Sequence, residues 1–345
     1  MINKFKHMIY SVVFVIILFS FISCRHVAIT DPHVSPPVPA FATSFYFSPI
    51  DLDKVEYLEP LGCVNPAGHT FPTDHVYFYY NLGTATHQYD PNFILPVYAP
   101  ASGMINFILE TGGPRADTKI MVQVNANFMY YLDHIILDST LALDSMVTAG
   151  QRVGVTGSAY AMDLGVINTN ITLPGLINPA RYGYTMNCDS PYKYYPEPLK
   201  SRMYALVNRI SADKDGKIDY DVKGRLIGNW FHESVKIEDS NGPIAWPKSI
   251  SFAPDSYDPS QMTIGSGGYI GILGKFKASP SDPDPAQVNV NSGKVIFHLN
   301  NYFRSGSSGL VAAQILDDLR MKIEYFSYTN SDTASFDSNA QIYTR

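Results

Sequence analysis

The chain has 345 residues, of which 46% are hydrophobic, 13% aromatic and 16% charged, and its formal net charge at pH 7 is −6. A chain this rich in aromatic residues and this poor in charge folds rather than staying disordered, and its length suits two domains. The acidic balance argues against nucleic acid or an anionic membrane surface as a partner.

The first residues have the pattern of a targeting segment. Lys4 and Lys6 precede an apolar run from Met8 to Ile22. A run of about fifteen residues is short for a membrane span, which needs about 20, and typical of a signal-peptide core. This segment has two lysines and no acidic residue, so its removal would make the remaining chain more acidic still.

The apolar run ends in a cysteine motif. The sequence Phe21-Ile22-Ser23-Cys24 resembles a bacterial lipobox, in which a small residue precedes the cysteine that is cleaved and acylated. We therefore expect residues 1–23 to be a lipoprotein signal peptide and Cys24 to carry the lipid. Two or more acyl chains anchor a protein stably to a membrane. The alternative is an ordinary signal peptide, or an uncleaved anchor, with an incidental cysteine.

The lipid reading implies a location and a tether. The protein would be an extracytoplasmic lipoprotein that is held at the membrane on the periplasmic or cell-surface side. Residues 24–44 contain several prolines and little apolar content. Such a composition predicts an extended tether that lifts the folded part off the membrane.

The rest of the chain reads as mainly β. Short apolar runs are separated by Gly, Pro, Asn and Asp, as at 75–80, 104–109, 128–132, 269–276 and 321–326. Helical periodicity is found at 201–210 and 309–319. We expect a first β domain at 45–185 and a second β-rich domain, of unknown role, at 186–345.

Candidate metal ligands occur in three separate stretches of the expected first domain. These stretches are Gly68–His75, Tyr131–Ile135 and Ala161–Val166, and their candidate residues are His69, Asp74, His134 and Asp163. Catalytic zinc takes three histidine or carboxylate ligands and keeps one position for water. If Asp74 begins a strand, alternation sends His75 to the opposite face, which makes His75 less suited to share a metal with Asp74 unless a bulge intervenes.

Two hairpin motifs lie between these stretches. Val97–Ile105 and Val147–Gly154 each predict a strand, a tight turn and a return strand. Taken in order over residues 62–170, the five motifs resemble the LytM-like (M23) family of zinc endopeptidases, which cut peptidoglycan cross-links. The resemblance implies a barrel-sandwich hybrid fold for the first domain. It also implies a zinc cofactor held by His69, Asp74 and Asp163, with His134 assisting catalysis.

The sequence departs from the family pattern at each element. The spacing of His69 and Asp74 is H-x4-D where the family has H-x3-D, Asp163 stands where the family has a ligand histidine, and Ala161 replaces an assisting histidine. A second carboxylate makes the site more anionic and weakens the acidity that the metal confers on water. Ala161 cannot transfer a proton. Each candidate also has an ordinary alternative, as a loop residue, a turn cap, an ion-pair partner or a half-buried histidine.

Three functions stay open from the sequence. The first is a zinc-dependent peptidoglycan hydrolase in the cell envelope. The second is a non-catalytic relative that binds peptidoglycan or regulates a partner hydrolase. The third is a surface carbohydrate-binding protein, which only the 24 tyrosines favour.

Two further cysteines need a role. Cys63 and Cys188 could form one disulfide outside the cytoplasm, where such bonds persist. We expect this bond, with two buried free thiols as the alternative.

Overall fold

The computed structural model describes residues 37–83, 90, 92–110, 117–157, 160–303, 306–328, 330 and 333–345. Cys24, the expected signal peptide and most of the expected tether lie outside these residues. Among the residues that are described, no helix has the length and the apolar character that a membrane crossing requires.

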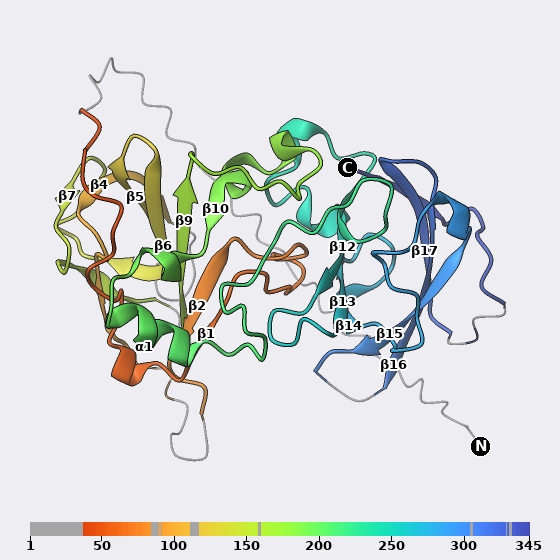
Figure 1. Cartoon of the computed structure of the whole chain (residues 1–345), viewed down its shortest axis with the longest axis horizontal. Helices are drawn as coiled ribbons and strands as arrows, with labels where there is room; N and C mark the ends of the chain where they lie inside the picture. The colour runs from red at the N-terminus through yellow and green to blue at the C-terminus, as the bar shows by residue number, and fades with distance from the viewer. Residues whose placement is uncertain are drawn as a thin grey trace, which may run out of the picture. The chain divides into compact units, whose positions relative to one another are not determined.

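The chain is mainly β, as the sequence predicts, and the first ten strands form one sheet (Figure 1). They are β1 (Tyr57–Glu59), β2 (His75–Tyr79), β3 (Pro96–Tyr98), β4 (Gly103–Glu110), β5 (Thr118–Asn125), β6 (Phe128–Leu137), β7 (Met146–Val147), β8 (Arg152–Thr156), β9 (Ala161–Asn168) and β10 (Cys188–Asp189). The main path is β1-β2-β9-β6-β5-β4-β7, while β10 pairs with β9 and β8 pairs with β3 and β6. This order places β9 between β2 and β6. Each of these three strands includes part or all of one of the sequence stretches that hold the candidate metal ligands.

The other eight strands close into a barrel. They are β11 (Gly228–His232), β12 (Ser249–Pro254), β13 (Met262–Gly267), β14 (Leu273–Lys277), β15 (Val295–Asn301), β16 (Ser307–Ile315), β17 (Arg320–Phe326) and β18 (Gln341–Thr344). Large side chains such as Trp230, Phe252 and Phe297 fill its interior and are buried completely. Each strand of the barrel therefore contributes to a packed core.

One expected helix is wrong and the other is confirmed. The α-helix α1 (Leu199–Leu206) overlaps the predicted helix at 201–210. The segment 309–319 forms β16 instead, between β15 and β17. Four consecutive residues of β16, Leu310 to Ala313, are completely buried. A strand that is buried on both faces reads as a continuous apolar run, and periodicity alone does not separate such a run from a buried helix.

Short 3-10 helices complete the secondary structure. They are η1 (Leu52–Lys54), η2 (Pro179–Arg181), η3 (Gly183–Asn187), η4 (Pro191–Tyr194), η5 (Ile237–Asp239), η6 (Trp246–Lys248) and η7 (Val290–Ser292). The core of the sheet takes in Tyr192, Met203 and Ile218, which come after the expected domain boundary at 185. The segment with η4 and α1 thus packs on the sheet of strands β1 to β10, and we call this sheet with its packed segments the sheet body.

The expected disulfide between Cys63 and Cys188 is wrong, because both cysteines are free and buried. Cys188 lies on β10, opposite Ile167 of β9, and belongs to the core of the sheet. Cys63 lies near Glu59 and Lys275. Burial raises the pKa of both thiols well above the ordinary value, which keeps them protonated and poorly reactive.

We expect both thiols to resist alkylation in the folded protein and to react fully after unfolding. The check is intact-mass analysis after iodoacetamide treatment without a reducing agent, in buffer and in guanidinium chloride. Each of the two cysteines should gain one label only in the denaturant. A mass two hydrogens lower, with neither cysteine labelled after unfolding, would restore the disulfide.

Candidate functional site

The pairing of three strands brings the motif residues together. In the β2–β9 pair, Tyr77 lies opposite Asp163, and in the β6–β9 pair, Asp133 lies opposite Asp163. His75 begins β2, and His134 follows Asp133 on β6. Asp163, in the centre of the sheet, therefore meets a histidine from each neighbouring strand.

Asp163 is a buried carboxylate between two imidazole rings. Its Oδ2 lies 3.4 Å from Nε2 of His75 and 3.5 Å from Nε2 of His134. The residue is 2% exposed, and its Oδ1 has no hydrogen-bond partner among the described residues. A buried carboxylate oxygen without a partner carries a desolvation cost that a cation or a bound water would relieve.

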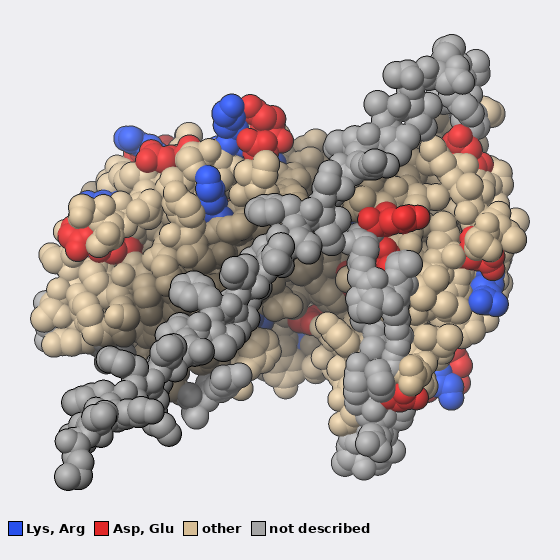
Figure 2. All heavy atoms as spheres, turned by 180° about the vertical axis from the view of Figure 1, so that it is seen from behind, with Lys and Arg blue, Asp and Glu red and all other residues tan. Residues whose placement is uncertain are grey.

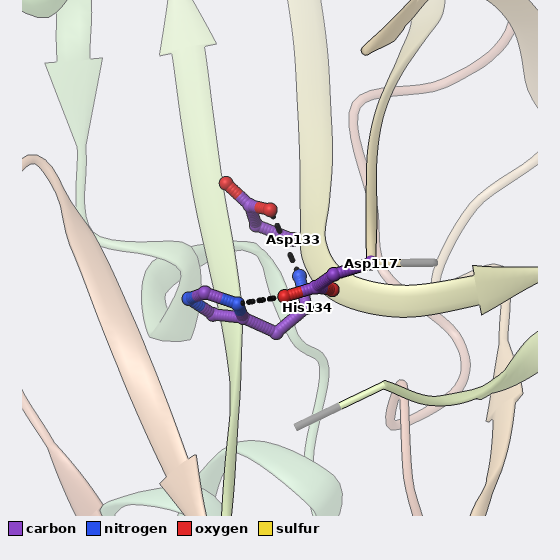
Figure 3. A group of neighbouring side chains, drawn as sticks. All are labelled: Asp117, Asp133 and His134. Atoms are coloured by element: carbon purple, nitrogen blue, oxygen red, sulfur yellow. Dashed lines mark hydrogen bonds and ion pairs between the residues drawn. The ribbon is translucent and has the colours of Figure 1, made fainter. Parts of the chain in front are cut away.

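The second nitrogen of each imidazole is held by another carboxylate. Nδ1 of His75 lies 3.0 Å from Oδ1 of Asp74, and Nδ1 of His134 lies 2.7 Å from Oδ2 of Asp117 (Figure 3). An ionised carboxylate only accepts, so both Nδ1 atoms carry the hydrogen. This leaves both Nε2 atoms directed at Asp163, which is the arrangement that orients histidine ligands in metal sites.

Asp74 accepts three hydrogen bonds from side chains. Its Oδ1 also accepts the hydroxyl of Tyr131 at 2.7 Å, and its Oδ2 accepts the hydroxyl of Thr185 at 2.5 Å. Asp74 and Asp163 contact different nitrogens of the His75 ring. The structure thus places Asp74 as the residue that holds His75, on the other side of the imidazole from Asp163.

His69 flanks the cluster and contacts His75 and Tyr77, not Asp163, among the described residues. Its ring centroid lies 5.2 Å from that of His75 and 6.4 Å from that of Tyr77. Burial and the charge of His75 lower the pKa of His69 to about 3, so this imidazole is neutral. Of the sequence-predicted residues, Asp163 and His134 lie together, Asp74 supports them through His75, and His69 lies beside them.

His75 is the residue that the sequence prediction set aside. The strand begins at His75 and not at Asp74, so the alternation expected from residue 74 does not apply. His75, Tyr77 and Tyr79 share one face of β2, and the register puts that face over Asp163. The hydroxyl of Tyr77 lies 3.0 Å from Nε2 of His75 and adds a further polar group.

A break in the β5–β6 register positions His134. The residue has a positive φ of 62°, which is uncommon outside glycine. The pairing shifts between Thr118 and Ile120 opposite this point. Such bulges re-aim side chains, and here the backbone N–H of His134 donates to Asp133 Oδ1 at 2.8 Å while the imidazole turns to Asp117 and Asp163.

His134 also belongs to a second cluster of possible metal ligands, with Asp117 and Asp133, in which Asp133 is already paired with a lysine. Ligand atoms of Asp117, Asp133 and His134 lie within 4.8 Å of one another (Figure 3). Asp133 Oδ2, however, pairs with Lys119 Nζ at 3.4 Å, and Lys119 also lies 3.8 Å above the ring of Tyr131. A cation at this group would have to displace Lys119, whereas Asp163 Oδ1 has no hydrogen-bond partner to lose in the described part of the chain.

The donors around Asp163 fit a divalent metal ion. Imidazole nitrogen and carboxylate oxygen are the ordinary ligands of zinc. Bonds of about 2.0–2.1 Å in a tetrahedral site separate ligand atoms by roughly 3.3 Å, close to the two separations at Asp163. The set His75, Asp163 and His134 therefore matches zinc in chemistry, and Tyr77 stands next to it.

Protons compensate the carboxylates when no metal is bound. Burial disfavours charge on His134, but Asp117, Asp163 and Asp133 outweigh it and raise the pKa to about 9. Burial likewise opposes charge on His75, and Asp163 and Asp74 raise its pKa above the ordinary value. A metal ion bound to Nε2 of His134 must displace the proton that this raised pKa favours, so binding should release protons.

No protein-family model and no curated protein matches the chain. Solved structures match parts of it. Csd3 from Helicobacter pylori is 14% identical over 36% of this chain and 32% of its own, with a TM-score of 0.27. A zinc-containing peptidase from Vibrio cholerae is 14% identical over 39% of this chain and 38% of its own, with a TM-score of 0.27. The catalytic domain of the M23 protein EnpA from Enterococcus faecalis is 15% identical over 38% of this chain and 86% of its own, with a TM-score of 0.24. The chain thus spans about a third of the length of the first two.

We expect Gly165→Ala to disrupt the cluster. A Cβ at this position would lie 2.1 Å from the ring of Tyr131, the residue that donates to Asp74. Overpacking of this kind costs about 1–3 kcal/mol. Gly242→Ala is the control, because no atom of the described residues lies within 4 Å of a Cβ there. Denaturant unfolding should show the loss for Gly165→Ala alone, and equal stability of both variants would contradict the close contact.

We expect the metal-free protein to lose stability as the pH rises. The pKa of His134 is about 9 in the folded chain and about 6.5 in an unfolded one. The folded state therefore binds the proton more tightly, and this stabilisation is complete below pH 6.5 and disappears through pH 9. Urea unfolding in EDTA across this range is the measurement. His134→Gln should flatten the profile, and an unchanged slope in that variant would refute the assignment.

Proposed function

We propose that the sheet body is a divergent M23-like domain that binds one zinc ion and acts on the peptide of the cell wall as a hydrolase. One observation carries the proposal. Two imidazoles, each fixed through Nδ1 by a carboxylate, present Nε2 to a buried carboxylate that has an unpaired oxygen. His75, Asp163 and His134 are the residues that would hold the ion.

The roles of the surrounding residues follow from their contacts. Zinc, when bound, would polarise the peptide carbonyl and lower the pKa of a water molecule. Asp74 and Asp117 keep both imidazoles in the tautomer that offers Nε2. Tyr77 and Tyr131 are buried and keep water from the inner side of the cluster. His134 has 41% of its side chain exposed, so a substrate would approach from its side.

A second candidate is zinc-dependent binding without cleavage. Ala161 lies on the same face of β9 as Asp163 and opposite Tyr79 of β2. An alanine there supplies no proton-transfer group next to the cluster, although hydrolysis depends on one. The domain would then bind peptidoglycan or a partner hydrolase instead of cutting it.

The anchor completes the proposal. A lipid on Cys24 would hold the domain at the membrane outside the cytoplasm, where cell-wall peptide is accessible. The apolar run and the Ser23-Cys24 pair of the sequence support this placement. Mass spectrometry of the mature chain should find residues 1–23 removed and lipid on Cys24, and a mature chain that starts elsewhere would contradict it.

We expect the full chain to bind about one equivalent of zinc. Asp163→Ala should abolish binding, because it removes the carboxylate that both imidazoles face. Asp133→Ala is the matched control, since Asp133 borders His134 but pairs with Lys119. Metal analysis after dialysis is the measurement. Loss of zinc in the control, with retention in Asp163→Ala, would move the site to the acidic group of Figure 3.

Peptidoglycan digestion separates the two candidates. If the site is catalytic, zinc-loaded protein should release soluble muropeptides. Ala161→His should raise the rate, since a positioned acid or base contributes about 10²–10⁴-fold. Zinc binding with no release by either protein would reject the hydrolase and leave the binding role.

A further inference from the structure

A second cavity, lined by none of the three proposed zinc ligands, lies among residues of the sheet body and of the barrel. Its volume is about 300 Å³. This is at the lower end of the range for small-molecule pockets, which runs from about 300 to 1,000 Å³. The cavity is therefore suited to a ligand, or to a unit of a larger ligand, of about one ring.

Aromatic rings form the walls of this cavity. Tyr57 and Tyr79 stack with centroids 4.6 Å apart and an interplanar angle of 30°. Tyr302 covers the ammonium of Lys275 at 3.8 Å. Tyr257 is 44% exposed and borders the same space. Rings that line an accessible cavity offer flat apolar faces to a ligand.

The basic group of the cavity, Lys275, already has an ionic partner, while its acidic group, Glu59, accepts from neutral hydroxyls. Lys275 Nζ lies 2.7 Å from Asp255 Oδ2, with 5% and 2% of the two side chains exposed. Burial opposes ionisation of Asp255, but Lys275 outweighs it and lowers the pKa of that carboxyl. Glu59 accepts hydrogen bonds from Tyr79 at 3.2 Å and from Ser256 at 2.9 Å. An anionic ligand would therefore find no unpaired cation among the described lining residues, and the carboxylate of Glu59 stays available as a further hydrogen-bond acceptor.

Neutral polar groups, in contrast, are available. The side chains of Asn65, Asn208, Tyr57 and Tyr257 line the cavity and have no side-chain hydrogen bond to any described residue. An amide offers both donors and an acceptor, and a phenol offers one of each. Flat rings beside neutral donors and acceptors match a sugar, which has apolar C–H faces and a rim of hydroxyls.

The cavity is held in place by hydrogen bonds between its parts. Arg209 Nη1 donates to the carbonyl of Ser256 at 2.7 Å, and the N–H of Ile210 donates to the carbonyl of Tyr257 at 3.0 Å. The hydroxyl of Ser251 donates to the carbonyl of Thr70 at 2.6 Å. A pre-formed pocket loses less conformational entropy on binding.

We propose that this cavity binds an uncharged sugar unit of a glycan. Figure 2 shows acidic and basic side chains in small scattered groups on one face of the molecule, separated by wide areas of other residues. The proposal stands on the cavity alone and does not need zinc or peptide cleavage.

The test uses the full chain and a tetramer of β-1,4-linked N-acetylglucosamine, titrated by calorimetry. Binding should saturate, and Tyr257→Ala and Asn208→Ala should each weaken it by about tenfold, for the loss of a ring contact or a hydrogen-bonding amide. Tyr184→Ala is the matched control, because Tyr184 is 59% exposed and does not line the cavity. Asp163→Asn should leave sugar binding unchanged, which separates this site from the zinc proposal.

Four results would overturn the assignment. The first is the absence of saturable binding by the folded full chain. The second is an equal loss in Tyr184→Ala and Tyr257→Ala, which would indicate a nonspecific effect. The third is loss in Asp163→Asn alone, which would place the sugar at the zinc site. The fourth is displacement by inorganic phosphate or tetramethylammonium, which would show an ionic preference.

Discussion

The buried carboxylate of Asp163 constrains the centre of the sheet. A charge that is 2% exposed is costly unless it is paired, and β9 carries it between two other strands. Those strands supply a histidine each, and the protons of these histidines neutralise the carboxylate. His75 is buried, with 7% of its side chain exposed, whereas His134 is 41% exposed, and Asp74 and Asp117 contact the two rings from the far side. One carboxylate on β9 thus accounts for a chain of charges that crosses the sheet.

The packing around this chain of charges is equally restrictive. Tyr131 reaches Asp74 across the strand that holds Asp163, and it does so over Gly165, where no side chain obstructs it. Thr185 approaches Asp74 from η3, well after the last motif in the sequence. The cluster therefore depends on residues beyond the region that carries the sequence motifs, and the core of the sheet likewise extends to Ile218.

The sequence predicts the β class, and it also singles out Asp163 and His134, which the structure brings within 3.5 Å of each other. Asp163 and His134 stand in motifs whose order along the chain indicates a common site. His75 was missed because its face depends on where β2 begins, and this start is set by tertiary pairing with β9. The helix expected at 309–319 failed because complete burial removes the periodic signal. The prediction of a disulfide was wrong because the positions of two cysteines in the sequence do not tell how far apart they lie in the folded chain.

The register of β2 also explains how the two proposed sites relate. His75, Tyr77 and Tyr79 follow one another on one face of this strand, with ring centroids 4.8 Å and 5.9 Å apart. The first contacts Asp163, and the last lines the second cavity. At roughly 3.3 Å per residue, the two sites are separated by about 13 Å along the strand. On the two proposals above, a polymer that joins a sugar to a peptide, as peptidoglycan does, would reach both sites. If the zinc site does not hydrolyse peptide, the same spacing would still let one polymer contact the protein at two places on β2. Two linked contacts raise the overall affinity even when no bond is cleaved.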